Sequence, residues 1–231
     1  MDQAEFDKFA EEYSALHAHN VRLSGESPEY FAEYKTRDVA TYLSDRNIGT
    51  ERILDFGAGV GGSIPHFRRH LPDARLTCLD VSRASLAIAE NRFPGQADFV
   101  PFDGDTIPFA DSHFDAAFAA CVFHHVDKTE HVPLFEEIRR VLRPGGHFFI
   151  FEHNPLNPLT VHAVNTCQFD ENAVLIGRGA LSRRLQRAGF EIAARRYRIF
   201  FPRPLKSLRP LERFLTWLPL GAQYYLVGRK C

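Results

Sequence analysis

The chain has 231 residues, 45% of them hydrophobic, and a formal net charge of −1 at pH 7. This composition can bury one substantial core, and the balanced charge argues against nucleic acid as a main partner. The acidic, amphipathic N-terminus lacks the basic start and apolar core of a signal peptide, and no apolar run is long enough to span a membrane. We therefore expect a cytoplasmic protein with no integral membrane segment.

The chain from residue 2 to about residue 46 has a helical pattern in two segments, separated by the sequence RLSGES. Before the second segment, Ser27 can cap the helix and Pro28 can occupy its first position. We expect residues 1–48 to form an N-terminal helical cap.

A glycine-rich turn follows the first predicted strand, in the stretch RILDFGAGVGGS from residue 52 to residue 63. Four glycines in six residues indicate positive φ angles or close approach to a ligand, and a helix starting near Gly62 or Ser63 would direct free N–H groups at that ligand. Alternatively, the turn is a tight strand-to-helix connection without a ligand. Asp55, inside the strand, would repel a pyrophosphate and suits a ligand that carries positive charge.

The rest of the chain alternates between strand and helix patterns. The predicted strands span 75–80, 97–102, 114–121, 146–152, 190–200 and 222–230, and the predicted helices span 82–91, 133–142 and 179–188. This alternation predicts a Rossmann-like α/β fold, a doubly wound parallel sheet with helices on both faces. LRPGG at 142–146 is expected to close a helix and turn tightly into the next strand. The segment 154–174 is irregular at first and helical only in part, which indicates a loop or lid, and 202–220 is punctuated by prolines. With the N-terminal helices, the segments 154–174 and 200–220 are expected to form the cap.

Acidic residues occur at the carboxyl ends of three predicted strands, where ligands of such sheets bind. Asp55 precedes the glycines, Asp80 ends the second strand, and Asp103 follows the third. Asp80 is placed to accept both ribose hydroxyls of an adenosine, and Asp103 could take the adenine amino group. Alternatively, Asp80 assists capping beside Ser82, and Asp103 forms a turn.

Four ordered motifs make the sequence similar to the class I S-adenosylmethionine-dependent methyltransferases, in the broad group that includes the ubiquinone and menaquinone C-methyltransferases. The motifs are LDFGAGVGG at 54–62, LD at 79–80, FDGDTIPFADSHFDAAFAACVFHHV at 102–126 and EIRRVLRPGGHFFIFE at 137–152. The resemblance is close over residues 50–152. It implies S-adenosyl-L-methionine as the cofactor and a seven-stranded sheet with the last strand antiparallel. Within one methyltransferase domain, 49–153 would be the cofactor-binding core and 154–231 the lid and the completion of the sheet.

The family's site residues can be carried over to matching positions. The resulting cofactor-binding set is Lys35, Asp55, Gly57, Ala58, Gly59, Gly61, Asp80, Val81, Asp103, Gly104, Ala120 and Cys121. The glycines would lie against the methionine moiety, Asp55 would order the loop or the ammonium group, and Asp80 would hold the ribose. Asp103 and Gly104 would contact adenine. The backbone at Ala120 and Cys121 would face the methionine end, and Lys35 could lie over its carboxylate.

Two other functions remain open at this stage. An NAD(P)-dependent dehydrogenase of Rossmann type would need phosphate-binding donors, whereas carboxylates suit the cationic sulfonium and ammonium groups of S-adenosylmethionine. A non-catalytic S-adenosylmethionine-binding module would keep the pocket without turnover. CVFHHV at 121–126 replaces the Asn-Pro-Pro-aromatic motif of nucleobase-modifying relatives, so no nucleic-acid substrate is expected.

Methyl transfer is an in-line displacement, and it needs a base only when the nucleophile keeps its proton. The catalytic candidates are His125, Glu152 and His153, which follow the fourth and fifth strands. We expect His153 to act as the base, since an imidazole titrates near neutrality. Glu152 would orient the loop or bind the cofactor's edge, and His125 is alternatively a structural residue. No metal is expected, because the histidines and the four separated cysteines show no ligand spacing.

The segment 178–213 contains eleven Lys or Arg residues against two acids, interleaved with Phe and Leu. This pattern is typical of a solvated basic face around a core strand. Alternatively, the segment forms an apolar, basic rim that binds a lipid-like or anionic acceptor at a membrane surface. In that case the protein would make peripheral contact with the membrane. The expected partner is a small-molecule or lipid-like methyl acceptor, and no oligomeric state is predicted.

Overall fold

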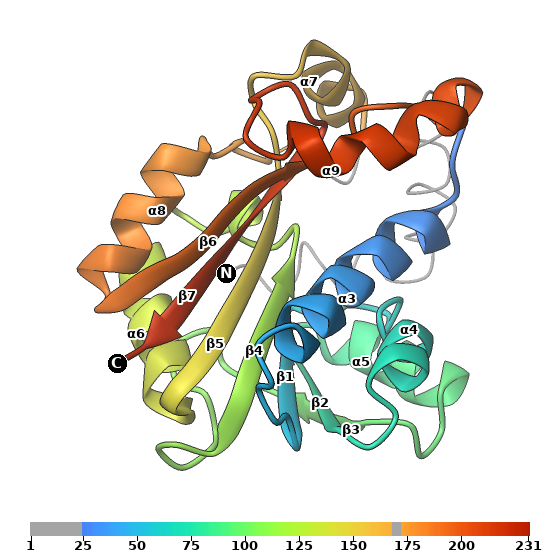
Figure 1. The fold of residues 1–231 in the computed structure, drawn as a ribbon. Coiled ribbons are helices and arrows are strands. Elements are labelled where there is room, and N and C mark those ends of the chain that lie inside the picture. Colours follow the sequence, from blue (N-terminus) through green and yellow to red (C-terminus); the bar gives the residue numbers. More distant parts are fainter. Residues whose placement is uncertain (1–24, 168–171) are drawn as a thin grey trace.

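A computed structural model describes residues 25–167 and 172–231 (Figure 1). Its centre is a seven-stranded sheet in the order β3-β2-β1-β4-β5-β7-β6. The strands are β1 (Arg52–Phe56), β2 (Arg75–Asp80), β3 (Asp98–Pro101), β4 (Phe114–Ala120), β5 (Leu142–His153), β6 (Phe190–Arg198) and β7 (Gln223–Lys230). β7 runs antiparallel to both of its neighbours, β5 and β6, and all pairings among strands β1 to β5 are parallel. The predicted doubly wound sheet with its last strand antiparallel is confirmed.

Helices cover both faces of the sheet (Figure 1). They are α3 (Pro28–Ser44), α4 (Ile64–His70), α5 (Arg83–Arg92), α6 (His131–Val141), α7 (Pro158–Asn165), α8 (Arg178–Arg187) and α9 (Glu212–Leu215), with 3₁₀ turns η2 (Phe123–His125) and η4 (Arg203–Leu211). One apolar cluster joins the sheet to α3, α4 and α5, and another joins it to α6 and α8. β5 serves both clusters, because successive side chains of a strand point to opposite faces. Phe148 and Ile150 enter one cluster, while Phe149 and Phe151 enter the other.

Most predicted elements appear within a few residues of their expected bounds, but the start of β5 differs. The LRPGG segment is part of β5 instead of a turn before it, because Leu142 already pairs with Phe114 of β4. The register then shifts between Phe114 and Ala116, and Gly145 takes a φ of +78°. A glycine accommodates this irregular backbone within the extended strand, so the turn signal marks a distortion instead of a strand boundary.

Helix α3 begins at Pro28 as predicted, with Ser27 at the N-cap position, although the Ser27 side chain makes no capping hydrogen bond. The first of the two predicted N-terminal segments lies outside the described residues. No helix in the described parts of the chain is both long enough and apolar enough to cross a membrane.

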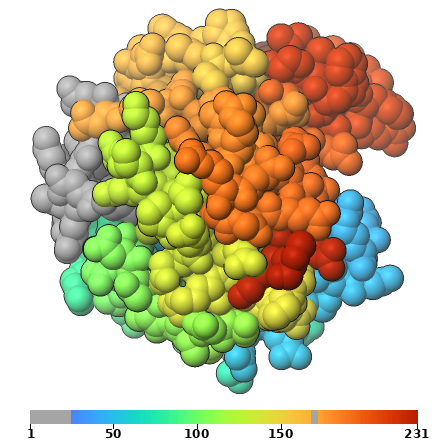
Figure 2. All heavy atoms as spheres, turned by 90° about the vertical axis from the view of Figure 1, so that its left-hand side faces the viewer, coloured from blue at the N-terminus to red at the C-terminus, as the bar shows by residue number. Residues whose placement is uncertain are grey.

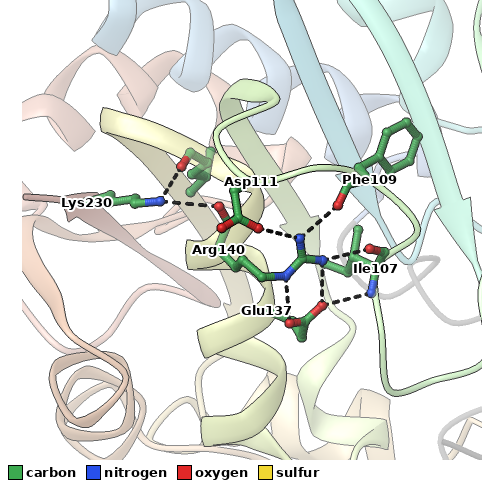
Figure 3. Close-up of polar contacts among 7 residues, drawn as sticks. Ile107, Phe109, Asp111, Glu137, Arg140 and Lys230 are labelled. Atoms are coloured by element: carbon green, nitrogen blue, oxygen red, sulfur yellow. Dashed lines mark hydrogen bonds and ion pairs between the residues drawn. The ribbon is translucent and has the colours of Figure 1, made fainter.

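Arg140 fixes the segment between β3 and β4 to helix α6, at the amino edge of the sheet (Figure 3). Its guanidinium donates hydrogen bonds of 2.8–2.9 Å to the carbonyls of Ile107 and Phe109 and to the carboxylates of Asp111 and Glu137. Lys230 at the end of β7 donates to the carbonyl of Arg140 at 3.2 Å. The network therefore supports the edge opposite to the strand ends where ligands of this fold bind.

Candidate cofactor and acceptor site

The glycine turn between β1 and α4 takes its shape from positive φ angles at Gly57 (+72°), Gly59 (+53°) and Gly61 (+78°). A Cβ atom at Gly57 would lie 2.6 Å from Val122, and one at Gly61 would lie 2.8 Å from Ile64. Those glycines are thus required by packing as well as by φ. A Cβ at Gly59 would meet no atom of residues 25–167 or 172–231 within 4 Å, so among these residues the turn presents an open stretch of backbone there.

Asp80 at the end of β2 is buried and ties the strand to the glycine turn. Its Oδ2 accepts the Gly59 N–H at 2.7 Å and its Oδ1 accepts the Ser82 N–H at 2.9 Å. Ser82 in turn caps α5 by accepting the Ser85 N–H. Asp80 therefore assists the Ser82 cap of α5, which is the alternative role considered for it. Its carboxylate also lies directly at the open backbone of Gly59.

Asp55 in β1 is buried beneath the turn, and the Ser63 hydroxyl donates a hydrogen bond to its Oδ2. Burial raises the pKa of Asp55 to about 7, against the opposing effect of the Ser63 hydrogen bond. A carboxyl group in this position gains stability as an anion when a cation binds nearby.

Asp103 lies after β3 and is exposed. Its Oδ1 accepts the N–H groups of Asp105 and Thr106, both at 2.9 Å, and these bonds lower its pKa. The turn-forming role considered for Asp103 is thus present. Val81 and Gly104 are neighbours, since a Cβ at Gly104 would lie 3.9 Å from the Val81 side chain. Contact of these residues with adenine stays a prediction.

Cys121 follows β4 with a left-handed φ of +59°, a strained conformation for a residue other than glycine. The buried Lys35 of α3 places its Nζ 3.4 Å from the Cys121 Sγ, and Gln223 places its Nε2 3.7 Å from the same atom. Burial alone would raise the pKa of the Cys121 thiol, but His153 and Lys35 lower it to about 7. The thiol is therefore surrounded by donors that stabilise a thiolate.

His153 at the end of β5 is held by residues from other elements. The antiparallel register pairs His153 with Gln223 of β7, and the Gln223 Nε2 lies 3.4 Å from the His153 Nδ1. The Tyr34 hydroxyl donates to the Gln223 Oε1, which turns the amide N–H toward His153. Because Nδ1 then accepts, a neutral His153 carries its proton on Nε2.

Glu152 is 1% exposed and points away from His153 along the strand. It accepts the Phe123 N–H at 2.8 Å, and the His124 Nδ1 lies 2.7 Å from its other oxygen. Burial alone would raise the pKa of Glu152, but His124 and the Phe123 N–H hold it below its ordinary value. Glu152 thus fixes the segment after β4. His125 lies beside His124, with ring centroids 4.2 Å apart.

The structure brings Lys35, Cys121 and His153 together and adds Gln223, which the sequence analysis missed. The binding and catalytic roles expected for Lys35, Cys121 and His153 stay predictions. Sequence offered no local signal for Gln223, because its place beside His153 depends on the β5–β7 register. Ala120, the last residue of β4, pairs with Phe151 and leads directly into Cys121. Among the described residues, no three His, Cys, Asp or Glu side chains are grouped so as to hold a metal ion.

Comparison with family models matches residues 54–150 to a methyltransferase domain. A probable phthiotriol/phenolphthiotriol dimycocerosates methyltransferase 2 of Mycobacterium ulcerans is 34% identical over 112 residues, covering 47% of this chain and 42% of the relative. A ubiquinone/menaquinone biosynthesis C-methyltransferase of Desulfotalea psychrophila is 31% identical over 131 residues, covering 56% and 52%. The matches thus span about half the length of these curated relatives.

Solved structures share the fold. A SAM-dependent methyltransferase from Thermotoga maritima superposes with a TM-score of 0.67 at 18% identity, covering 99% of both chains. Another from Aquifex aeolicus gives 0.64 at 13% identity, covering 100% of both chains. At these identities the likeness establishes the fold. The family resemblance carried by the motifs is confirmed by the family model over residues 54–150.

Proposed function

We propose that this chain, whose residues 54–150 belong to the S-adenosylmethionine-dependent methyltransferases, transfers a methyl group to a small or amphipathic acceptor that lies beside Cys121 and His153. The observation that carries the proposal is the arrangement of the carboxyl edge of the sheet. There the turn that carries Gly59 packs against Val122, next to a partly exposed Cys121 thiol. Lys35 holds this thiol, and Gln223 holds the partly exposed imidazole of His153.

The residues present fit S-adenosylmethionine. Gly59 offers a backbone that no side chain of the described residues covers, and Asp80 already accepts a hydrogen bond at that point, so its carboxylate is placed to take ribose hydroxyls. Asp55 beneath the turn favours a cationic ligand. Lys35 would meet the methionine carboxylate. When bound, the cofactor supplies an electrophilic methyl group on a sulfonium, and the protein's part is alignment and exclusion of water.

Proton transfer, where the acceptor needs it, is assigned to Cys121 and His153 as a pair. The hydrogen bond from Gln223 leaves a neutral His153 as a donor at Nε2, whereas a Cys121 thiolate with a pKa of about 7 can accept a proton near neutrality. The Cys121 thiolate would take the proton that the acceptor loses, and the Nε2–H of His153 would stabilise that thiolate beforehand. His153 is thus proposed as the partner of the base, in place of the base itself that the sequence analysis expected. Glu152 and His124 are positioning residues, since their contacts lie within the buried segment after β4.

The acceptor class draws support from two relatives, one named as a methyltransferase of phthiotriol and phenolphthiotriol dimycocerosates and one as a C-methyltransferase of ubiquinone/menaquinone biosynthesis. The compounds in both names are amphipathic or apolar molecules. We therefore propose an amphipathic acceptor. Screening a lipid and metabolite extract with radiolabelled S-adenosylmethionine would identify it, and binding of the cofactor without any turnover would favour the non-catalytic module.

The proposed roles are tested with His153→Ala and Cys121→Ser, assayed against that acceptor. We expect each to lower turnover by about 10²–10⁴, with cofactor affinity and melting temperature nearly unchanged. The pH–rate profile should lose its acidic limb near pH 7 in Cys121→Ser. If both variants keep that limb, the titrating base lies elsewhere. If calorimetry finds binding of NAD and none of S-adenosylmethionine, the dehydrogenase function replaces the proposal.

A further inference from the structure

Large apolar side chains are exposed together at one end of the molecule. Leu159 and Trp217 are each 69% exposed, and Phe214 is 62% exposed. The full set, here called the apolar cap surface, is Leu156, Leu159, Leu205, Leu208, Leu211, Phe214, Trp217 and Leu220. The 3₁₀ helix η4 contributes three of these leucines and buries none of its residues. Exposed apolar groups gathered this densely mark an interaction surface.

The apolar cap surface is continuous although it comes from two stretches of sequence. Asn154 donates to the carbonyls of Pro219 and Gly221 at 3.1 and 2.8 Å, and Asn157 donates to the carbonyl of Leu220 at 2.7 Å. These bonds fasten the loop before α7 to the segment after α9. Both stretches lie at the same end of the molecule in two perpendicular views (Figures 1 and 2).

The two stretches that form the apolar cap surface carry net positive charge. Arg203, Lys206 and Arg213 are exposed between the apolar residues. The segment 154–167 contains no acidic residue, and 199–222 contains only Glu212. Glu212 is buried and accepts the N–H groups of Phe200 and Phe201, both at 3.0 Å, so its carboxylate is turned inward. A partner of this surface must therefore offer negative charge together with apolar depth.

We propose that the apolar cap surface docks on an anionic lipid surface, with Trp217 and Phe214 inserted among the acyl chains and Arg203, Lys206 and Arg213 at the headgroups. Exposed Trp, Phe and Leu beside Lys and Arg are the side-chain set of interfacial elements that lie on a bilayer. Negatively charged headgroups attract the cations, and the acyl region takes up the apolar area.

The place of this surface links it to the site. Asn154 directly follows His153, and Gly221 and Ala222 directly precede Gln223. The two stretches that the Asn154 hydrogen bonds join therefore run directly from the site residues to the apolar cap surface. Docking would therefore hold the acceptor side of the site at the lipid surface. This consequence, delivery of an amphipathic acceptor from the bilayer, rests on the proposed function.

The test uses Trp217, the only tryptophan of the chain, as an intrinsic probe. Full-length protein is titrated with phosphatidylcholine vesicles that contain either no phosphatidylglycerol or roughly 30% of it, which makes the surface strongly anionic. Binding is followed by Trp fluorescence and by co-sedimentation. We expect a blue shift and sedimentation with the anionic vesicles and little of either with neutral ones. No cofactor or acceptor is present, so failure here is distinct from failure of methyl transfer.

Charge variants make the test specific. Lys206→Glu with Arg213→Glu should weaken binding to anionic vesicles by at least about tenfold, since each basic side chain at such a surface contributes about fivefold. The matched control is Arg52→Glu with Arg75→Glu, exposed residues paired at the amino edge of the sheet, and it should bind as the unmodified protein does. Leu208→Ser with Phe214→Ser should reduce the blue shift.

Several outcomes would overturn the proposal. They are an absence of vesicle binding, equal binding to neutral and anionic vesicles, and equal weakening by the control pair. A Trp217 shift that follows protein concentration without lipid, together with a dimer in sedimentation equilibrium, would instead assign the surface to a second copy of the chain.

Discussion

The two sides of the carboxyl edge of the sheet are built in different ways. Beside β1 and β2, the site consists of carboxylates and glycine backbone, and Asp55, Gly59 and Asp80 come from a short continuous stretch of sequence. Beside β4, β5 and β7, the groups are an ammonium, a thiol and an imidazole, drawn from residues as distant as Lys35 and Gln223. The acidic side suits the cationic cofactor, whose structure is the same for every acceptor. The other side depends on long-range packing, which can differ between proteins that act on different acceptors.

Among the substitutions on the side of β4, β5 and β7, here called the acceptor side, removal of the Glu152 carboxylate should lower the free energy of unfolding most. Glu152→Ala leaves the buried Phe123 N–H and His124 without their acceptor, so we expect a loss of about 3–5 kcal/mol in the free energy of unfolding, measured by urea denaturation. Glu152→Gln should cost less, because an amide oxygen still accepts the Phe123 N–H. A loss below about 1 kcal/mol in Glu152→Ala would mean that this segment relaxes freely.

On the cofactor side, Asp80→Ala should weaken S-adenosylmethionine binding by about 1.5–3 kcal/mol, the usual range for hydrogen bonds to a charged group, as measured by calorimetry. The Gly59 N–H also loses its partner, so the melting temperature should be recorded alongside. Asp103→Ala is the comparison variant, since Asp103 already serves a turn. Unchanged affinity in Asp80→Ala would place the ribose elsewhere.

The electrostatics of the acceptor side can be measured through the reactivity of Cys121. In a Cys231→Ser background, which removes the exposed cysteine, iodoacetamide should label Cys121 with a midpoint near pH 7. Lys35→Met should move the midpoint upward by about one pH unit, equal to about 1.4 kcal/mol, since the thiolate loses a neighbouring cation. Labelling should slow when S-adenosylmethionine is bound. A midpoint unaffected by Lys35→Met would separate that lysine from the thiol.

The most gradual effect, spread over three pH units, concerns Asp55 and the pH dependence of stability. Because burial raises its pKa to about 7, the native state keeps the proton after the unfolded chain has released it near pH 4. The unfolded state therefore binds fewer protons between about pH 4 and 7, and this group makes stability fall as pH rises through that window. Asp55→Asn should flatten the slope of unfolding free energy by up to about 1 kcal/mol per pH unit. An unchanged slope would show that Asp55 ionises normally.

The sequence by itself determined the fold class and the glycine turn and carboxylates of the acidic side. Alternating strand and helix patterns predicted the doubly wound sheet, since the period of apolar residues reflects which side chains each element buries. The positions Gly57 and Gly61 followed from local backbone requirements, and Asp80 from its distance beyond the turn. These features depend on residues close together in the chain, where bonding geometry limits the alternatives.

The tertiary structure decided the acceptor side. Glu152 and His153 are adjacent in sequence, yet one anchors His124 inside the protein and the other meets Gln223 across the β5–β7 register. That register, and the approach of Lys35 to Cys121, follow from the packing of α3 and β7 against β5. Local sequence does not encode such contacts, because they bring together residues separated by long stretches of chain whose relative positions only the complete core establishes.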